Sequence, residues 1–294
     1  MKNTIVYITD PNIAGGGFAD RITGMALLYR ISKSFNCDFR IHFKQPFDFF
    51  DAFPSKSSIY KFDDIILKNP NSKLKIFNLI DENFTTNIDQ LCKSLISEDG
   101  ITALVFINNI KSFIFDPVYN NFIEIKHNQN DIDEIERNVL FEFGQQFLET
   151  NLKIFNSNVI RTINKLNSKT IGVQIRLGGN NSNWVDPNFK VPDFHSIISK
   201  LKELQSNFNQ VYISSDNIDY KNNLIKIISE KWPTIFLNET PLHLERSSSE
   251  HSNFLSRSLG DHYLLRKCTV GIITSGGGYG RTAAIIEGAP YFRV

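Results

Sequence analysis

Four short stretches of this chain combine glycine, hydroxyl and charged residues in patterns that suit an anionic ligand. They occupy residues 15–21, 174–181, 214–217 and 274–283. Each follows, directly or after a few residues, a short apolar run of the kind that forms a buried strand. Ligands of open α/β sheets bind beyond the carboxyl ends of the strands, so the four stretches are candidates for one binding site.

Arg176 is the clearest candidate within the run TIGVQIRLG. Gln174 and Arg176 point to the same face of an extended strand, whereas the neighbouring Ile175 and Leu177 point to the other face and can pack. An arginine at a strand end, followed by glycines, suits bidentate binding of phosphate or carboxylate. A surface salt bridge is the alternative for this arginine.

The stretch TSGGGYGRTA near the C-terminus reads as a strand end, a glycine turn and a helix start. Glycines let backbone N–H groups approach a ligand, and a helix N-terminus favours negative charge. The stretch lacks the Gly-Lys-Ser/Thr ending of a Walker A loop, and too few residues follow it for a dinucleotide fold. A plain tight turn is the alternative. The candidate contacts here are Ser275, Gly278, Tyr279, Arg281 and Thr282.

The stretch GGGFADR follows the first apolar run, where a dinucleotide fingerprint would lie. The GxGxxG pattern needs glycine at position 20, but the residue is Asp20, so the pattern disfavours a nicotinamide cofactor. Asp20 is a candidate general base, or alternatively a partner of the helix dipole. The other candidate contacts in this stretch are Gly16, Gly17, Phe18 and Arg21.

The stretch SSDN follows the apolar run VYI. Asp216, with Ser215 before it, is suited to accept hydrogen bonds from ribose hydroxyls or a base edge. A helix N-cap is the alternative, because Ser, Asp and Asn all favour that position.

Two series of alternating strands and helices predict an α/β protein with two Rossmann-like domains, 1–160 and 161–294. The first opens with a strand at 3–9, a helix at 18–35 and a strand at 37–43. A mostly helical segment at 131–167 leads into the second. The segment 55–130 shows only short candidate strands, at 74–80 and 103–109.

Composition excludes several classes of function. The net charge of +1 indicates no nucleic-acid partner. Cys37, Cys92 and Cys268 form no CxxC pair, and the six histidines show no metal-ligand spacing, so we expect no metal site. No signal peptide, membrane span or GxSxG elbow is visible, so we expect a cytoplasmic protein and no serine hydrolase.

In this order, the four stretches resemble the motifs of the fucosyltransferase superfamily. That group includes plant-type α1,2-, nodulation-factor α1,6- and protein O-fucosyltransferases. GGGFADR resembles the family's glycine-rich GxGN/D-R loop, and GVQIRLGG is similar to the G-x-Q-x-R strand of plant-type members. YISSDN and TSGGGYGRTA resemble the last two motifs, and LGDHYLL resembles the acidic helix before the final strand. The resemblance covers residues 13–31 and 170–294.

The resemblance implies a GT-B fold with two facing Rossmann-like domains. It also implies an inverting, metal-independent transfer of fucose from GDP-fucose to a glycan or protein hydroxyl, with no cofactor besides the donor. Domain 161–294 would bind the donor, with Arg176 on the diphosphate and Asp216 on ribose or guanine. Domain 1–160 would face the acceptor, with Asp20 as the candidate base.

The chain also departs from the family's HxRRxD motif. Gln174, Leu177 and Gly179 stand in place of its histidine, second arginine and aspartate. A non-catalytic nucleotide- or carbohydrate-binding protein on the same fold is therefore the alternative hypothesis.

Overall fold

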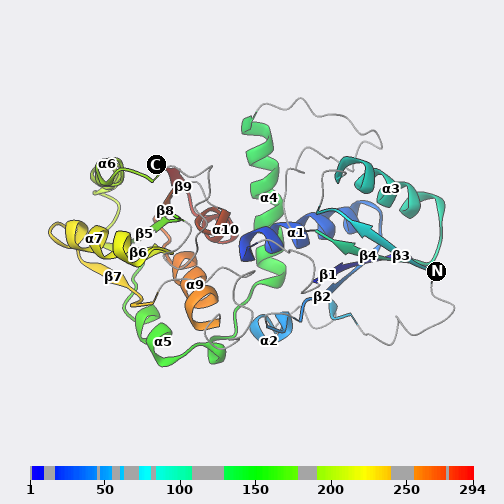
Figure 1. The fold of residues 1–294 in the computed structure, drawn as a ribbon, viewed down its shortest axis with the longest axis horizontal. Helices are drawn as coiled ribbons and strands as arrows, with labels where there is room; N and C mark the ends of the chain where they lie inside the picture. Colours follow the sequence, from blue (N-terminus) through cyan, green and yellow to red (C-terminus); the bar gives the residue numbers. More distant parts are fainter. Residues whose placement is uncertain are drawn as a thin grey trace. The chain divides into compact units, whose positions relative to one another are not determined.

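The computed structural model divides the chain into two compact units, Met1–Glu149 (the first unit) and Thr150–Val294 (the second unit) (Figure 1). The boundary predicted after residue 160 falls inside helix α5 (Ser157–Ile163) of the second unit. The structure describes residues 2–9, 17–44, 47–54, 60–62, 73–80, 84–107, 129–177, 191–239, 255–275 and 278–294.

The first unit is built on a parallel sheet that, within the described residues, has the order β2-β1-β4-β3. Its strands are β1 (Thr4–Ile8), β2 (Asp38–His42), β3 (Lys73–Asn78) and β4 (Ile101–Phe106). Its helices are α1 (Phe18–Ser34), α2 (Phe49–Ala52), α3 (Phe84–Ser97) and α4 (Gln129–Phe147). The candidate strands at 74–80 and 103–109 are thus confirmed as β3 and β4, whereas helix α3 between them was not predicted.

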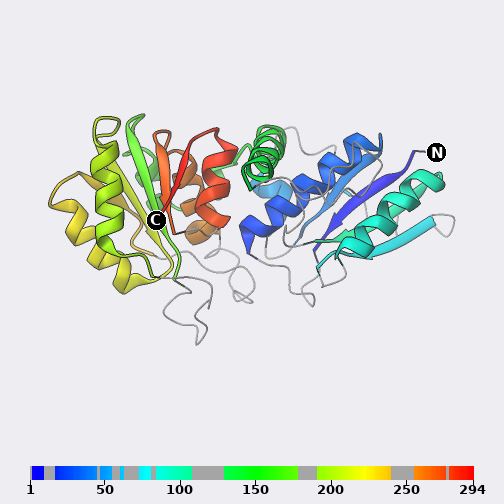
Figure 2. The ribbon, with the colours of Figure 1, turned by 90° about the horizontal axis from the view of Figure 1, so that it is seen from above.

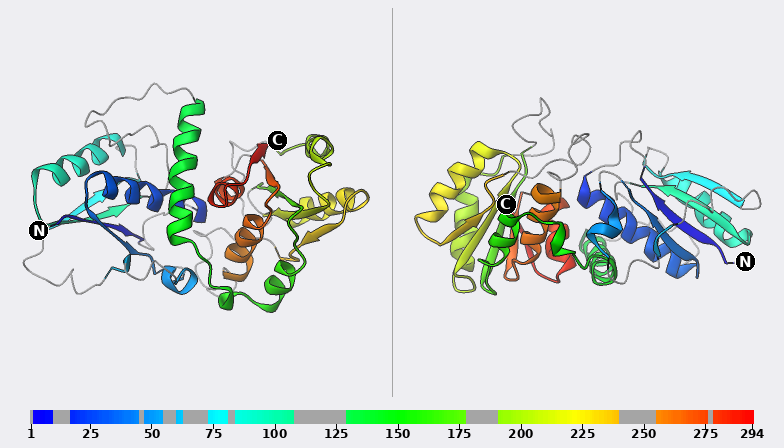
Figure 3. Two further views of the ribbon diagram at one scale, coloured as in Figure 1. Left: turned by 180° about the vertical axis from the view of Figure 1, so that it is seen from behind. Right: turned by 90° about the horizontal axis from the view of Figure 1, so that it is seen from below.

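Helix α1 is buried on nearly all sides, because the sheet covers one side and α4 crosses the other (Figure 3). Aromatic rings fill the space between them. Tyr29 of α1 packs edge-on to Phe147 of α4 with ring centroids 4.9 Å apart, and Phe147 also contacts Phe39 of β2 at 5.9 Å. Aromatic pairs of this kind add to the stability of a core. The first glycine turn is therefore attached to a firmly held helix.

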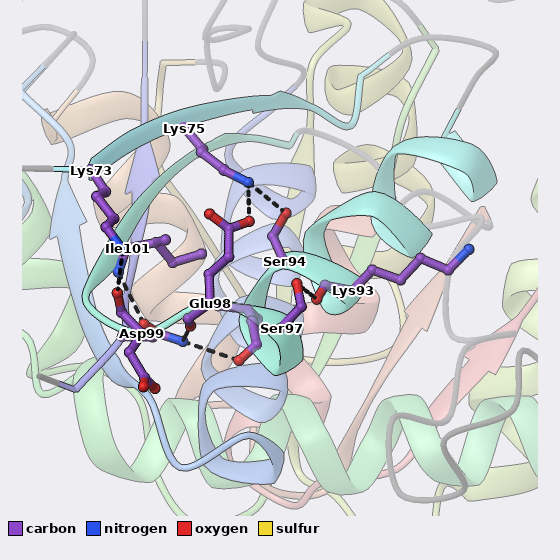
Figure 4. Close-up of polar contacts among 10 residues, drawn as sticks. Lys73, Lys75, Lys93, Ser94, Ser97, Glu98, Asp99 and Ile101 are labelled. Atoms are coloured by element: carbon purple, nitrogen blue, oxygen red, sulfur yellow. Dashed lines mark hydrogen bonds and ion pairs between the residues drawn. The ribbon is translucent and has the colours of Figure 1, made fainter.

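Polar side chains tie α3 to the sheet of the first unit (Figure 4). Lys75 of β3 donates to Ser94 at 3.2 Å and pairs with Glu98, both at the C-terminal end of α3. Asn3 donates to the carbonyls of Leu95 and Glu98 at 3.0 and 2.8 Å. These contacts lie at the end of the sheet away from the carboxyl ends of its strands, so they serve stability.

The second unit is built on a parallel sheet that, in the described part of the chain, has the order β7-β6-β5-β8-β9. The strands are β5 (Thr170–Ile175), β6 (Gln210–Ser215), β7 (Thr234–Phe236), β8 (Gly271–Thr274) and β9 (Tyr291–Arg293). Besides α5, the helices are α6 (Phe194–Leu204), α7 (Ile218–Ser229), α9 (Gly260–Arg266) and α10 (Gly278–Ile286). A 3₁₀ turn (Leu152–Ile154) and a π turn (Leu255–Leu259) complete the unit. The predicted α/β class with two Rossmann-like units is confirmed.

The two faces of the second sheet differ in chemistry. Helices α6 and α7 cover one face of the sheet (Figure 2), and Ile171, Val173 and Ile175 of β5 belong to the apolar cluster beneath them. The alternate residues Gly172 and Gln174 face α9 and α10 instead. The polar face therefore lies under the helix that the second glycine turn opens.

The strand orders locate the point in each sheet where the chain reverses direction. In the second sheet β5 lies between β6 and β8, so the reversal falls between β5 and β8. In the first sheet it falls between β1 and β4. Ligands of such sheets bind outside the carboxyl ends of the strands at this switch point. Among the helices of the described ranges, none has the length and apolar character needed to cross a bilayer.

Candidate functional site

Two of the predicted stretches meet at the switch point of the second unit. The backbone N–H of Arg176, directly after β5, donates to Oγ of Ser275, directly after β8, at 2.9 Å. The N–H of Ser275 donates in turn to the carbonyl of Gln174 at 3.3 Å. Both Arg176 and Ser275 are partly exposed. The structure thus brings the backbone of Arg176 and the hydroxyl of Ser275 together where a Rossmann-like sheet binds its ligand.

Asp216 connects the third stretch to the same place. Its Oδ1 accepts the backbone N–H of Leu177 at 2.7 Å, which ties the end of β6 to the end of β5. The N-cap of α7 is Asn217, whose Oδ1 accepts from Tyr220 N at 2.9 Å. The capping alternative for Asp216 is therefore filled by its neighbour. Ser215 is fully buried, and its Oγ accepts from Asn217 N at 3.2 Å.

Gly280 lets α10 pack directly against the strand ends. A Cβ atom at this position would lie 2.8 Å from Oε1 of Gln174, closer than real Cβ contacts, and 3.2 Å from Oγ1 of Thr274, closer than most of them. Those two side chains are themselves joined by a 2.9 Å hydrogen bond from Thr274 to Gln174. This glycine of the motif therefore serves helix–sheet packing.

Gln174 and Thr282 lie beneath the surface of the site. Gln174 is 2% exposed and Thr282 is 1% exposed. Thr282 donates to the carbonyl of Tyr279 at 3.1 Å, and its Oγ1 lies 3.3 Å from Nε2 of His262. Their described partners are internal, and contact of either side chain with a ligand stays a prediction.

A buried carboxylate, Asp261 of α9, supports the site from below. It is 1% exposed and accepts hydrogen bonds from Tyr212 and Ser214 of β6, both at 2.6 Å. Burial raises the pKa of Asp261, while these two hydrogen bonds act in the opposite direction. Asp261 was not among the predicted site residues. The signal that could have found it is the pair of hydroxyls two positions apart in the run VYISS.

His262 and Tyr279 hold the first turn of α10 in place. Their rings meet edge to face with centroids 5.0 Å apart, and the Tyr279 hydroxyl donates to the carbonyl of Ser258 in the π turn. Burial lowers the pKa of His262 to about 3, with a smaller contribution from the charge of Arg266. His262 is therefore neutral at physiological pH.

At the start of α1, the charged residues of the first glycine-rich stretch contact other groups of the first unit. Gly17 is the N-cap of α1, and its N–H donates to Oδ2 of Asp20 at 2.8 Å. Arg21 is 7% exposed and lies 5.5 Å from the ring centre of Phe43. Phe18 is buried against Phe47. Asp20 thus lies at the helix N-terminus, as its alternative role requires, and its role as a general base stays a prediction. Gly16 lies outside the described residues.

Thiol and metal chemistry receive no support from the described residues. Cys37, Cys92 and Cys268 are free and buried, and burial raises the pKa of Cys37 to about 11 and of Cys92 to about 12. These thiols are therefore protonated at neutral pH, whereas the thiolate is the reactive form. In the part of the chain that the structure describes, no three His, Cys, Asp or Glu residues gather as a metal site would require.

Comparison with known proteins identifies the fold. No family model matches the sequence, and no curated protein matches it in sequence. Among solved structures, FUT1 of Arabidopsis thaliana, a variant in complex with GDP, matches over 100% of this chain and 71% of its own. Its identity is 13% and its TM-score 0.62. POFUT1 in complex with GDP-fucose matches over 99% of this chain and 98% of its own, at 11% identity and a TM-score of 0.50. The apo form of POFUT1 matches over 99% and 97%, at 12% identity and a TM-score of 0.50.

This chain has the fold of the fucosyltransferases. The predicted resemblance is thereby confirmed for the fold, which is what a likeness at 10–13% identity can establish. Within this fucosyltransferase fold, the predicted contacts of the second unit belong to the ends of β5, β6 and β8 or to α10. They are Gln174, Arg176, Ser215, Asp216, Ser275, Gly278, Tyr279, Arg281 and Thr282. Their roles toward a ligand stay predictions.

Proposed function

We propose that this chain is a glycosyltransferase that uses a GDP-sugar donor, with GDP-fucose as the first donor to test. The observation that carries the proposal is the hydrogen bond from the backbone N–H of Arg176 to Oγ of Ser275, which brings both residues to the β5/β8 switch point. The complexes of FUT1 with GDP and of POFUT1 with GDP-fucose, on the same fold, support the choice of donor.

The chemistry needs groups that stabilise a leaving diphosphate. Negative charge grows on GDP as the bond to the sugar breaks, and preorganised donors at that place lower the barrier. We assign this role to the Arg176 guanidinium, the Ser275 hydroxyl and the N-terminal end of α10, with Arg281 adding a second positive charge. Because the chain can supply these charges itself, we propose a metal-independent reaction.

We further propose inversion at the sugar carbon, with the acceptor hydroxyl of a glycan or protein as nucleophile. A base must then take the hydroxyl proton during attack. Asp20 is the candidate, and its Oδ2 accepts the N–H of Gly17 at the start of α1. The acceptor side is assigned to the first unit, and the expected cytoplasmic location stays a prediction.

One specific observation favours a second candidate function. The family's second motif arginine is Leu177 here, and this leucine packs against the apolar cluster beneath α6 and α7. Gln174, in place of the motif histidine, is buried. A chain with this site could bind a GDP-sugar without transferring it, so a non-catalytic binding protein is the alternative.

Calorimetry and donor hydrolysis test the proposal together. We expect the full chain to bind GDP more tightly than ADP or UDP, and to release GDP slowly from GDP-fucose without an acceptor. Parallel assays with EDTA and with Mg²⁺ test metal independence. Absence of GDP binding would reject the proposed donor site. The non-catalytic alternative would be selected if the chain binds GDP but neither hydrolyses GDP-fucose nor transfers fucose to any acceptor in a panel of glycans and peptides.

A further inference from the structure

A cleft of about 280 Å³ opens at the β7 edge of the second unit, away from the switch point. Strand β6 separates β7 from β5, so the cleft is distinct from the proposed donor site. One wall is α5 and the turn after it, and the other is β7 with the residues that follow it. The lining residues are Asn158, Arg161, Thr162, Lys165, Thr234, Ile235, Phe236, Leu237, Asn238 and Glu239.

The wall formed by β7 presents backbone groups. Among the strands that the structure describes, β7 pairs on one side only, with β6. The N–H of Val211 donates to the carbonyl of Pro233 at 2.9 Å, so the ladder uses positions 233 and 235. Because alternate residues of a parallel strand bond to opposite sides, Thr234 and Phe236 direct their peptide groups away from β6. Such an edge can accept a further strand.

A buried lysine holds the chain directly after β7 in place. Lys221 of α7 is 1% exposed, and its Nζ donates to the carbonyls of Leu237 and of Glu239, the latter at 2.8 Å. Burial lowers the pKa of Lys221 because it disfavours the charged form. The rim of the cleft is therefore set by specific contacts inside the unit.

The wall formed by α5 carries two cations. Arg161 and Lys165 are exposed and four positions apart. Arg161 bonds to the neutral side-chain oxygen of Asn158 at 2.7 Å, and the Lys165 ammonium forms no ion pair with any residue in the described ranges. Glu239 is the single acidic residue of the lining, so the net charge of the described lining is positive.

We propose that this cleft is a docking site for an extended acidic peptide segment of a partner protein, which adds a strand to the edge of β7. The outward-facing peptide groups of Thr234 and Phe236 would bind the peptide backbone, and Arg161 with Lys165 would bind its carboxylates. Strand addition of this kind takes affinity from main-chain hydrogen bonds and specificity from side-chain contacts. The proposal does not depend on the donor reaction.

Fluorescence anisotropy on the full chain provides the test. The probe is a fluorescein-labelled eight-residue peptide of alternating Glu and Thr. Two comparison peptides carry Lys in place of Glu, or N-methyl groups on alternate amides, which remove the backbone donors. We expect the acidic peptide to bind in the micromolar range, and both comparison peptides to bind about tenfold more weakly or worse.

Two double variants make the same change of charge at different places. One reverses two charges in the cleft, and the other, as a control, reverses two charges elsewhere on the same unit. We expect R161E/K165E to weaken binding of the acidic peptide about tenfold or more, because it replaces attraction by repulsion. K202E/K226E makes the same charge change on exposed residues of α6 and α7 and should leave binding nearly unchanged. Circular dichroism would show whether both variants keep the fold.

Three results would overturn the proposal. The first is no measurable binding of the acidic peptide to the wild-type chain. The second is equal weakening by K202E/K226E, which would indicate general charge attraction. The third is undiminished binding of the N-methylated peptide, because a cleft that binds charge without the strand edge would suit other polyanions, such as a nucleic acid, equally well.

Discussion

The glycine turns that open α1 and α10 are alike in position and unlike in chemistry. Each follows a strand at the switch point of its sheet, and each helix packs a glycine against a strand end. A Cβ at Gly24 of α1 would lie 3.0 Å from Ile107, directly after β4, and one at Gly280 of α10 would lie 2.8 Å from Gln174. The shared geometry is therefore close approach of a helix to the sheet.

The charged residues separate the two turns. In the first unit Asp20 caps its own helix and Arg21 is buried against Phe43. In the second unit Arg176 and Ser275 are partly exposed and joined by a hydrogen bond. A glycine-rich turn thus does not by itself define an anion site. The burial of the neighbouring charged residues differs between the units, and the partial exposure of Arg176 favours the second unit.

The largest effect is expected from Arg176. Replacing it by alanine should lower kcat/KM for transfer about a thousandfold, or about 4 kcal/mol, because the leaving diphosphate loses a charged donor. Stability should change little. The matched change Arg21→Ala should instead lower the melting temperature, because that side chain is buried. Kinetics, GDP calorimetry and thermal melts on both variants test the contrast. Transfer by Arg176→Ala above about a tenth of the wild-type rate would reject the diphosphate role.

Asp20→Asn tests whether the first turn contributes chemistry at all. Asparagine can still accept the N–H of Gly17, so α1 should keep its cap. A general base would be lost, and we expect kcat to fall about a hundredfold with GDP affinity unchanged. If Asp20→Asn transfers sugar at the wild-type rate while Asp20→Ala is merely less stable, the carboxylate is a cap and nothing more.

Acidic pH should lower the free energy of unfolding of the second unit through the buried His262. The pKa of His262 is lowered from 6.5 to about 3, so the unfolded chain takes up a proton that the folded chain refuses. The contribution to stability is present above pH 6.5 and is lost as pH falls toward 3. At pH 5 the free energy of unfolding should be lower by about 2 kcal/mol from this group alone.

Urea titrations at pH 7 and pH 5 would measure this loss. Both tryptophans, at positions 184 and 232, belong to the second unit, so their fluorescence reports on it. His262→Gln should remove much of the dependence, and the exposed His195→Gln should retain it. Equal pH dependence in the two variants would contradict a special role for the buried imidazole.

The smallest effects are expected at the two glycines. Gly280→Ala and Gly24→Ala should each destabilise their unit by about 1 kcal/mol, since overpacking slightly exceeds the gain in helix propensity. Gly280→Ala should also weaken GDP binding, because α10 must shift from the strand ends, whereas Gly24→Ala should not. Denaturation and calorimetry on the pair measure both quantities. If both variants lost GDP affinity equally, the stretches that open α1 and α10 would both contribute to donor binding.

Local patterns were sufficient for most of the elements and for part of the site, although helix α3 was not predicted from them. Alternation in the run VQIRL correctly directs Ile175 and Leu177 to the apolar cluster beneath α6 and α7. It also leads to Arg176 at a strand end, because side-chain direction along a strand has a period of two. The glycine-rich stretches and the helices after them were predictable from local residue types and from the helical spacing of apolar residues.

Tertiary structure decided what those residues contact. The strand orders, and with them the switch points, depend on pairing between distant segments such as β5 and β8. Asp261 and the cleft beside β7 were not predicted from sequence, and the two alternatives for Asp20 stayed open, because each needs partners whose distances and burial no local pattern specifies. Sequence alone therefore determined most of the elements and the residue types at their ends. Only tertiary packing decided which of those side chains are buried with partners inside their unit and which are exposed at its surface.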